Sequence, residues 1–301
     1  MKVAVTGSSG LVGKSLVDLL SSKGDQVIRL VRGSPTTDAM TVRWDPESGV
    51  RDPARLEGVD AVVHLAGESI AARRWNETQK QRIRDSRIHG TRALVNTVTG
   101  LTAPPKAFIC ASAIGYYGDR GDELLNEGSA PGSGFLADVC REWEAETEPA
   151  ARQGIRVVNL RFGVILSPRG GALAKMLTPF RLGVGGRVGD GRQYMSWVAL
   201  DDVTSPIHHA IVNPGLRGPV NVVAPDAVTN AEFTRVLARA LSRPALFPMP
   251  GFAVRALFGE MGEALLLASQ RVEPMRLRES GFRFAYPDLE SALGHLLSAP
   301  K

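Results

Sequence analysis

A glycine-rich turn directly after the first apolar run is the feature that most limits how this chain folds. The run ends at Thr6, and the letters GSSGLVG follow. Leucines then recur at helical spacing until Gly24 ends the pattern. The pattern predicts a strand, a tight turn at Gly7, an open backbone at Gly10, and a helix that packs closely through Gly13.

The alternation of strands and helices continues beyond this unit. Apolar runs typical of buried strands occupy residues 26–32, 60–67, 106–112 and 155–160. Helical patterns between or after them occupy residues 77–98 and 135–151. Strands that are apolar throughout, separated by helices, predict an α/β fold built on a Rossmann doubly wound parallel sheet.

Beyond about residue 167 the sequence becomes richer in turns, and its last part is helical and interrupted by prolines. With 301 residues, about two domains are expected. We predict a Rossmann domain at residues 1–166, with 197–225 returning to it. Residues 167–301 are then a smaller mixed α/β domain on the substrate side, helical at its end.

Composition excludes several classes of protein. The two cysteines, Cys110 and Cys140, cannot build a disulfide scaffold and favour a reducing compartment. No apolar run is long enough to span a bilayer, and no signal peptide precedes the first strand, so a cytoplasmic protein with no membrane partner is expected. A net charge of +5 with scattered arginines does not predict nucleic-acid binding. The long helices permit a monomer or a homodimer.

The glycine turn predicts a dinucleotide site, with a structural turn as the alternative. A helix N-terminus offers free N–H groups to a pyrophosphate, and Ser8 and Ser9 add hydroxyl donors. An NAD site places an acid about 20 residues after the glycines, at the end of the second strand. This chain has Arg32 there, with Arg29 and Ser34 nearby. An arginine binds a 2′-phosphate, so NADP(H) is favoured unless Arg32 is only a solvated surface residue.

Longer motifs carry a specific resemblance. They are GSSGLVG, HLAGESI, RRWN, ASAIGYYG, GRQYMSWVALDDV and, near the end, PMRLRESGFRFAYPDL. Together they resemble the extended short-chain dehydrogenase/reductase superfamily, and within it the atypical, epimerase-like branch of sugar-nucleotide epimerase-like proteins with a small C-terminal domain. The resemblance covers nearly the whole chain.

The resemblance implies how the cofactor is bound. The Leu65–Gly67 turn would lie beneath the adenosine, and Ile165 would touch the nicotinamide. Arg87 replaces an asparagine common in extended members and is suited to a phosphate, whereas Lys80 and Arg84 on the same helical face also fit a solvated surface. The expected cofactor-binding residues are Gly7, Ser8, Ser9, Gly10, Leu11, Val12, Gly13, Arg32, Leu65, Ala66, Gly67, Glu68, Arg87 and Ile165.

The residues for catalysis are less complete. Ordinary members use Ser, Tyr and Lys, in which the lysine lowers the pKa of the phenol. Ser112 matches the serine, but Phe135 and Val139 stand in the tyrosine and lysine positions. Tyr116 is a candidate relocated acid/base, and Glu68 is another; a binding or structural role remains open for both.

Other chemistries find no support. No histidine spacing suits a metal, no G-x-S-x-G motif is present, and Ala199 stands where related proteins often have a histidine. Trp44 and Asp45 border the adenine in one interpretation, but a packing tryptophan beside a turn aspartate is the preferred explanation. Two hypotheses follow: an NADP(H)-dependent oxidoreductase or epimerase acting on a small or sugar-derived substrate, or a non-catalytic NADP(H)-responsive binding protein.

Overall fold

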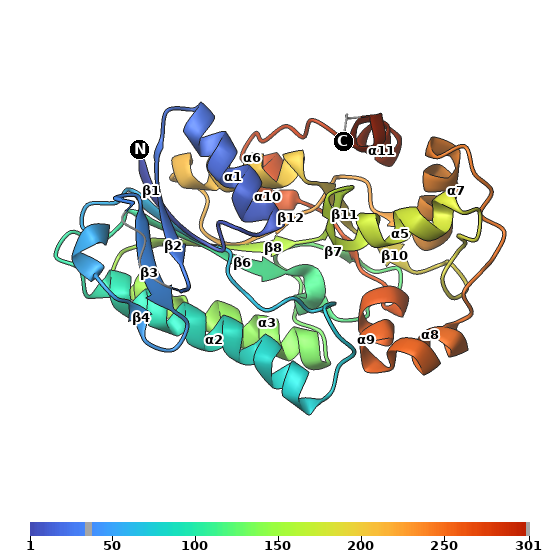
Figure 1. Cartoon of the computed structure of the whole chain (residues 1–301), viewed down its shortest axis with the longest axis horizontal. Helices are drawn as coiled ribbons and strands as arrows, with labels where there is room; N and C mark the ends of the chain where they lie inside the picture. The colour runs from blue at the N-terminus through green and yellow to red at the C-terminus, as the bar shows by residue number, and fades with distance from the viewer. Residues whose placement is uncertain (34–37, 299–301) are drawn as a thin grey trace.

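An eight-stranded sheet forms the centre of the molecule (Figure 1). The computed structural model describes residues 1–33 and 38–298. From edge to edge the strands are β12 (Gly218–Val222), β8 (Arg156–Phe162), β6 (Ala107–Ala113), β5 (Ala61–His64), β1 (Lys2–Thr6), β2 (Gln26–Val31), β3 (Thr41–Asp45) and β4 (Gly49–Val50). All neighbouring strands are parallel except β3 and β4. The predicted doubly wound α/β fold is therefore confirmed.

Helices cover both faces of the sheet. One face carries α1 (Leu11–Ser22) and α6 (Asp201–Val212), and the other carries α2 (Glu77–Thr99) and α3 (Phe135–Ala145) (Figure 1). Successive strand residues point to opposite faces, so Val3 and Val5 of β1 enter one core while Ala4 enters the other. Burial on both sides explains why the strands have continuous apolar sequences.

The predicted helix over residues 135–151 is interrupted. The structure has α3 ending at Ala145 and a separate α4 (Glu148–Arg152). Pro149 has no N–H to continue the helical hydrogen bonds, so it occupies the first turn of a new helix. The buried Thr147 donates its hydroxyl to the Glu144 carbonyl at 2.6 Å and accepts from the Asn159 amide at 3.2 Å. These two bonds hold the junction against β8.

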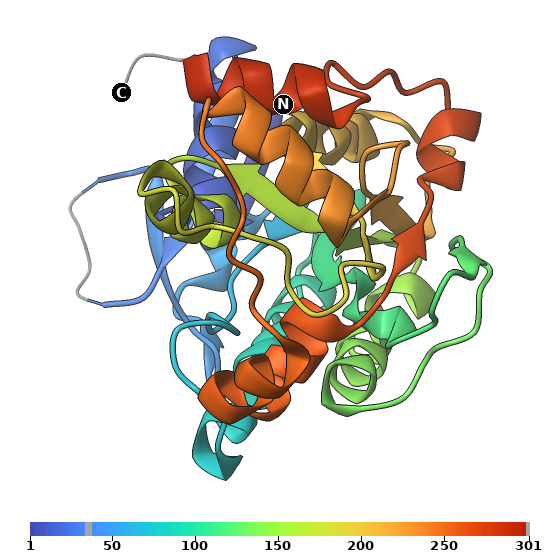
Figure 2. The same cartoon turned by 90° about the vertical axis from the view of Figure 1, so that its right-hand side faces the viewer.

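The other elements lie outside the central sheet, and part of them build a third core. They are η1 (Pro53–Leu56), η2 (Ile114–Tyr117), β7 (Leu124–Leu125), β9 (Val164–Ser167), α5 (Gly171–Arg181), β10 (Tyr194–Met195), β11 (Trp197–Ala199), β13 (Val228–Thr229), α7 (Asn230–Ala240), α8 (Gly251–Phe258), α9 (Glu260–Gly262), the π-helical turn η3 (Glu263–Leu267), β14 (Arg271–Val272), α10 (Met275–Glu279) and α11 (Leu289–Ser298). Figure 2 shows α7 and α11 packed together on this end of the molecule. Since β12 follows α6 and pairs with β8, the chain returns to the sheet after leaving it. The predicted domain bounds stay a prediction.

Candidate functional site

The glycine turn joins β1 to α1 at the point where the strand order reverses. Gly7 has a φ of +66°, and a Cβ there would lie 2.8 Å from the Leu65 carbonyl carbon. A Cβ on Gly13 would lie 2.1 Å from the Gly7 carbonyl oxygen. Both positions therefore require glycine, because side chains would collide with backbone.

Gly10 is different because it is exposed and its surroundings are less crowded. It is exposed, and the atom nearest to a Cβ built on it is the Gly7 oxygen at 3.3 Å. Gly10 is also the N-cap of α1, and no side chain of the described residues caps that helix. The first N–H groups of α1, including those of Leu11 and Val12, lie beside the half-buried Ser8 and the exposed Ser9. This arrangement suits an anion.

In doubly wound sheets a crevice forms where the strand order reverses, here between the carboxyl ends of β1 and β5. The end of β5 forms its side opposite the glycine turn. The Thr6 hydroxyl accepts from the N–H groups of Leu65 at 3.0 Å and Ala66 at 3.2 Å. Its oxygen is 2.7 Å from Nδ1 of the buried His64, so the hydroxyl proton goes to Nδ1 and the ring carries its own proton on Nε2. Thr6 thus fixes the Leu65–Gly67 turn beside Gly7.

His64 is held neutral. Burial, together with the charge of Arg87, lowers its pKa to about 3. Nε2 has no hydrogen-bond partner within the described part of the chain, and the ring packs edge-on against Trp44 at 5.6 Å between centroids. Trp44 is buried in β3, and Asp45 accepts from the N–H groups of Glu47 and Ser48. These contacts agree with the packing interpretation of Trp44 and Asp45.

A pH dependence of stability follows from His64. The unfolded chain takes up a proton below about pH 6.5 while the native ring stays neutral, so acid favours unfolding. We expect His64 to cost about 1.4 kcal/mol of stability per pH unit as the pH falls from about 6 to about 4. Urea unfolding across this range should show a shallower pH slope for His64→Asn than for the wild type. Removing the exposed His89 with His89→Asn should leave the slope unchanged; equal slopes for His64→Asn and the wild type would contradict this assignment.

Arg87 lies behind the Leu65–Gly67 turn. Its Nη1 donates to the carbonyls of Glu68 and Ile83, both at 3.0 Å, and its guanidinium lies over the Trp143 ring at 5.1 Å. A Cβ on Gly67 would lie 3.4 Å from its guanidinium carbon. Burial lowers the pKa of Arg87. No carboxylate of the described chain forms an ion pair with it, so a half-buried positive charge faces the turn.

The neighbouring cations of α2 have ordinary partners. Lys80 pairs with Glu260 at 3.1 Å, and Arg84 pairs with Glu142 at 2.7 Å. The interpretation of these two residues as surface cations agrees with the contacts.

The Glu68 carboxylate accepts from the Gln79 amide at 3.5 Å. Arg32 is exposed directly after β2, and the predicted Ser34 lies outside the described residues.

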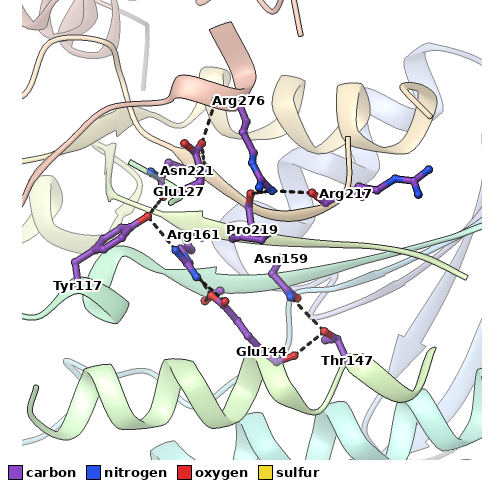
Figure 3. A network of polar contacts seen from close by, with 11 residues as sticks. Tyr117, Glu127, Glu144, Thr147, Asn159, Arg161, Arg217, Pro219, Asn221 and Arg276 are labelled. Carbon is purple, nitrogen blue, oxygen red and sulfur yellow. Dashed lines mark hydrogen bonds and ion pairs between the residues drawn. The ribbon is translucent and has the colours of Figure 1, made fainter. Parts of the chain in front are cut away.

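Ser112 belongs to a buried polar network. Ser112 is only 3% exposed, and its hydroxyl donates to Glu144 Oε1 at 2.6 Å. Arg161 donates two hydrogen bonds of 2.8 Å to the same carboxylate. Arg161 also donates to the Tyr117 hydroxyl, which in turn donates to Asn221 (Figure 3). The Ser112 hydroxyl therefore donates its proton to a hydrogen bond inside the protein, with Glu144 as the acceptor.

Sequence reasoning missed Glu144 and Arg161. Both are charged residues placed among buried ones, Arg161 inside an apolar strand and Glu144 on the inner side of α3. A charge in such a position needs a partner. That signal was in the sequence, but the identity of the partner was not.

Tyr116 lies half-buried in η2, just beyond β6. Its ring lies over the Arg161 guanidinium at 3.5 Å. The side-chain amide of Gln270 donates to the carbonyls of Ile114 and Gly118, one at each end of the turn. The turn that presents Tyr116 is therefore held by the sheet from one side and by the C-terminal part of the chain from the other.

Helix α3 presents no proton-transfer pair. Phe135 packs against Trp75, with centroids 5.1 Å apart, and Val139 is buried. Leu136 and Cys140 face Gly115, with the Cys140 sulfur 3.8 Å from the Cβ position of that glycine. Burial raises the pKa of Cys140 to about 12, so its thiol stays protonated.

Ile165 lies in β9, half-buried against the core beside α1. Its carbonyl is 3.5 Å from the Cβ position of Gly171, which also lies 3.9 Å from Leu11. Residues 165 to 171 thus reach the start of α1.

Across residues 1–33 and 38–298, no group of three metal-ligating side chains is found, and no helix is long and apolar enough to cross a membrane.

Comparison with known proteins agrees with this architecture. Residues 3–223 match the model of the NAD dependent epimerase/dehydratase family. An epimerase family protein of Mycobacterium tuberculosis is 46% identical over 298 residues, covering 99% of this chain and 98% of that one. The chain belongs to the NAD dependent epimerase/dehydratase family. Residues 249–296 match a domain of unknown function, DUF1731.

Solved structures of the epimerase/dehydratase family extend the likeness. The human epimerase family protein SDR39U1, crystallised with NADPH, is 35% identical with a TM-score of 0.89, covering 98% of this chain and 99% of that one. A nucleoside-diphosphate sugar epimerase from Corynebacterium glutamicum is 40% identical with a TM-score of 0.82. The match covers 99% of this chain and 58% of that one. The resemblance to atypical extended short-chain dehydrogenases/reductases is confirmed.

Proposed function

We propose that this protein binds NADP(H) in the crevice between β1 and β5. The uncapped start of α1 beside the open face of Gly10 carries the proposal, because it offers free N–H groups where a diphosphate needs them. The Leu65–Gly67 turn would support the adenosine, with Arg87 behind it as a phosphate-binding charge. Ile165 would border the nicotinamide. The human relative crystallised with NADPH supports this choice of cofactor.

The position of Arg32 favours NADP(H) over NAD(H). It is exposed at the end of β2, where an acidic residue would repel a 2′-phosphate. A guanidinium binds such a group with charge-assisted hydrogen bonds. NADP(H) should therefore bind more tightly than NAD(H).

The proposed reaction is hydride transfer at a carbonyl or alcohol carbon of a small or sugar-derived substrate, as in a reductase or an epimerase. NADP(H) supplies or accepts the hydride at its nicotinamide ring. The half-exposed Tyr116 is the proposed proton-transfer group, because Arg161 and Gln270 hold its turn in place. Glu68 is the second candidate for this role. The proposed role of Ser112 is positioning: its hydrogen bond to Glu144 fixes the end of β6.

A non-catalytic, NADP(H)-responsive protein is the second candidate function. The absence of a Tyr–Lys pair from α3 favours it, since Phe135 and Val139 stand in the two positions and neither transfers a proton. Transfer of labelled hydride from NADPH to any member of a broad carbonyl panel would exclude it. Binding of NADPH with no transfer across the panel would favour it.

Coenzyme binding is the direct test. At about 100 times its Kd, NADPH should stabilise the protein by about 2.7 kcal/mol, and NADH at the same concentration by less, in thermal-shift measurements. Gly10→Ala should fold, because among the described residues the one atom close to the new Cβ is the Gly7 oxygen at 3.3 Å, which needs to move by only a few tenths of an ångström. It should lose NADPH binding, because the Cβ occupies the exposed side of the turn. Gly294→Ala, in α11 with no atom of the described residues within 4 Å of its Cβ position, is the matched control and should bind normally.

Arg32→Ala should weaken NADPH binding about tenfold or more and leave NADH binding nearly unchanged. If neither coenzyme binds the wild type at millimolar concentration, the proposed function is wrong. Tighter binding of NADH than NADPH would remove the role of Arg32.

A further inference from the structure

A turn from the second half of the chain lies against the start of α1. It consists of Pro168–Gly170 between β9 and α5, and the Arg169 N–H donates to the Ser167 hydroxyl at 3.2 Å. A Cβ on Gly170 would lie 3.7 Å from the Leu11 side chain. The turn is therefore packed on the first residue of the helix that begins at the glycine turn.

The Arg169 side chain extends along the same helix. Its Nη2 donates to the Ser15 hydroxyl at 3.3 Å. Leu11 and Ser15 are four residues apart, so they share one face of α1 and are separated by about 6 Å along its axis. The guanidinium that now contacts Ser15 therefore lies about one helical turn from Leu11, which is a distance that an arginine side chain covers by changing rotamers.

Arg169 is an exposed arginine that makes no ion pair within the described residues. No carboxylate of the described residues lies within ion-pair distance of it, whereas Arg84 and Arg92 form ion pairs of 2.7 and 2.5 Å. Its only side-chain partner in the described chain is a neutral hydroxyl. A positive charge is therefore available at the mouth of the crevice.

The surroundings favour an anion at this place. Neither α1 nor α5 has an acidic residue in its first turn, and neither has a side-chain cap among the described residues. The N-cap of α5 is Gly170, which lies in the same turn as Arg169. Both helix starts add positive potential to that of the guanidinium.

We propose that Arg169 is a further cofactor-binding residue, which donates to the diphosphate bridge of the nucleotide held at the glycine turn. The inference rests on the proposed function and adds a contact from the second half of the chain. The bound nucleotide would then join the two halves, with α1 on one side of its diphosphate and the Pro168–Gly170 turn on the other.

Fluorescence titration of the full chain with NADPH and with NADH tests the inference. Arg169→Gln should raise the Kd of both coenzymes by a similar factor of about ten or more, because the diphosphate is common to both and a charge-assisted bond is lost. Arg169→Lys should recover part of the affinity. Arg152→Gln is the matched control, since that arginine is exposed on α4 and within the described residues pairs with Glu148 alone. The Kd of this variant should equal that of the wild type.

The outcomes separate the two levels of the argument. Unchanged Kd values for Arg169→Gln, with normal binding by the wild type, would overturn the role of Arg169 alone. Weakened binding of NADPH but not NADH would also overturn it, because the contact would then be to the 2′-phosphate. No binding by the wild type would overturn the proposed function itself. The melting temperature of the apo variant should match that of the wild type, since the Ser15 contact is exposed.

Discussion

Glu144→Ala is expected to lower the free energy of unfolding by about 3–5 kcal/mol, which is a large part of the stability of a typical domain. The Arg161 side chain is only 3% exposed, and Glu144 supplies both of the carboxylate oxygens that pair with it. Removal of the carboxylate leaves a buried positive charge without its counter-ion. It also leaves the Ser112 hydroxyl without its acceptor. Urea unfolding followed by circular dichroism measures the loss.

Two further variants show whether burial is the cause. Glu148→Ala removes one member of an exposed pair, in which Arg152 and Glu148 are 69% and 68% exposed, and should cost less than about 0.5 kcal/mol. The double variant Glu144→Leu with Arg161→Met removes both charges and should recover much of the lost stability, because an apolar pair needs no counter-ion. A cost for Glu144→Ala no greater than that for Glu148→Ala would show that the network contributes little.

Gly13→Ala should both destabilise the fold and abolish NADPH binding. The new Cβ would lie 2.1 Å from the Gly7 oxygen and 2.8 Å from both the Gly7 carbonyl carbon and the Ser8 Cα. These are backbone atoms, so α1 must move away from β1 to make room. We expect a loss of about 2–3 kcal/mol, at the upper end for overpacked cores, and a displaced helix start that no longer meets the diphosphate.

Comparison with other glycines separates the two effects of Gly13→Ala. Gly10→Ala should lose binding but keep stability, whereas Gly294→Ala should keep binding and gain about 0.5–1 kcal/mol of helix stability. Thermal unfolding and NADPH titration of the three variants give the comparison. Normal stability together with normal NADPH affinity in Gly13→Ala would show that the close approach of α1 to β1 is not required.

Local patterns were sufficient for much of the fold. The spacing of Gly7, Gly10 and Gly13 predicted a turn whose steric reasons the structure now shows. The helix over residues 77–98 was predicted to within one residue of α2, which starts after Asn76, a residue whose side chain accepts from the Gln79 N–H. These features depend on residues that are neighbours in the chain, so the sequence contains both partners at short range.

The candidate site was less predictable because its contacts join distant segments. Ser112 looked like a substrate-facing hydroxyl from its place after an apolar strand, yet it meets Glu144 from α3, while Arg161 comes from β8. Tyr116 was recognised from its turn, but its contacts with Arg161 and Gln270 were not. Each partner is an ordinary polar residue in the sequence, with no local mark of what it touches.

The sequence by itself determined the strand–turn–helix unit, the alternation that makes a doubly wound sheet, and the lack of a Tyr–Lys pair in the helix after Gly134. Tertiary structure alone decided that Ser112 is tied to a buried ion pair and that Arg169 lies against Ser15. The physical reason is range: backbone sterics and side-chain periodicity act between near neighbours, whereas parallel strands and their crossover helices bring together residues that are far apart in the chain.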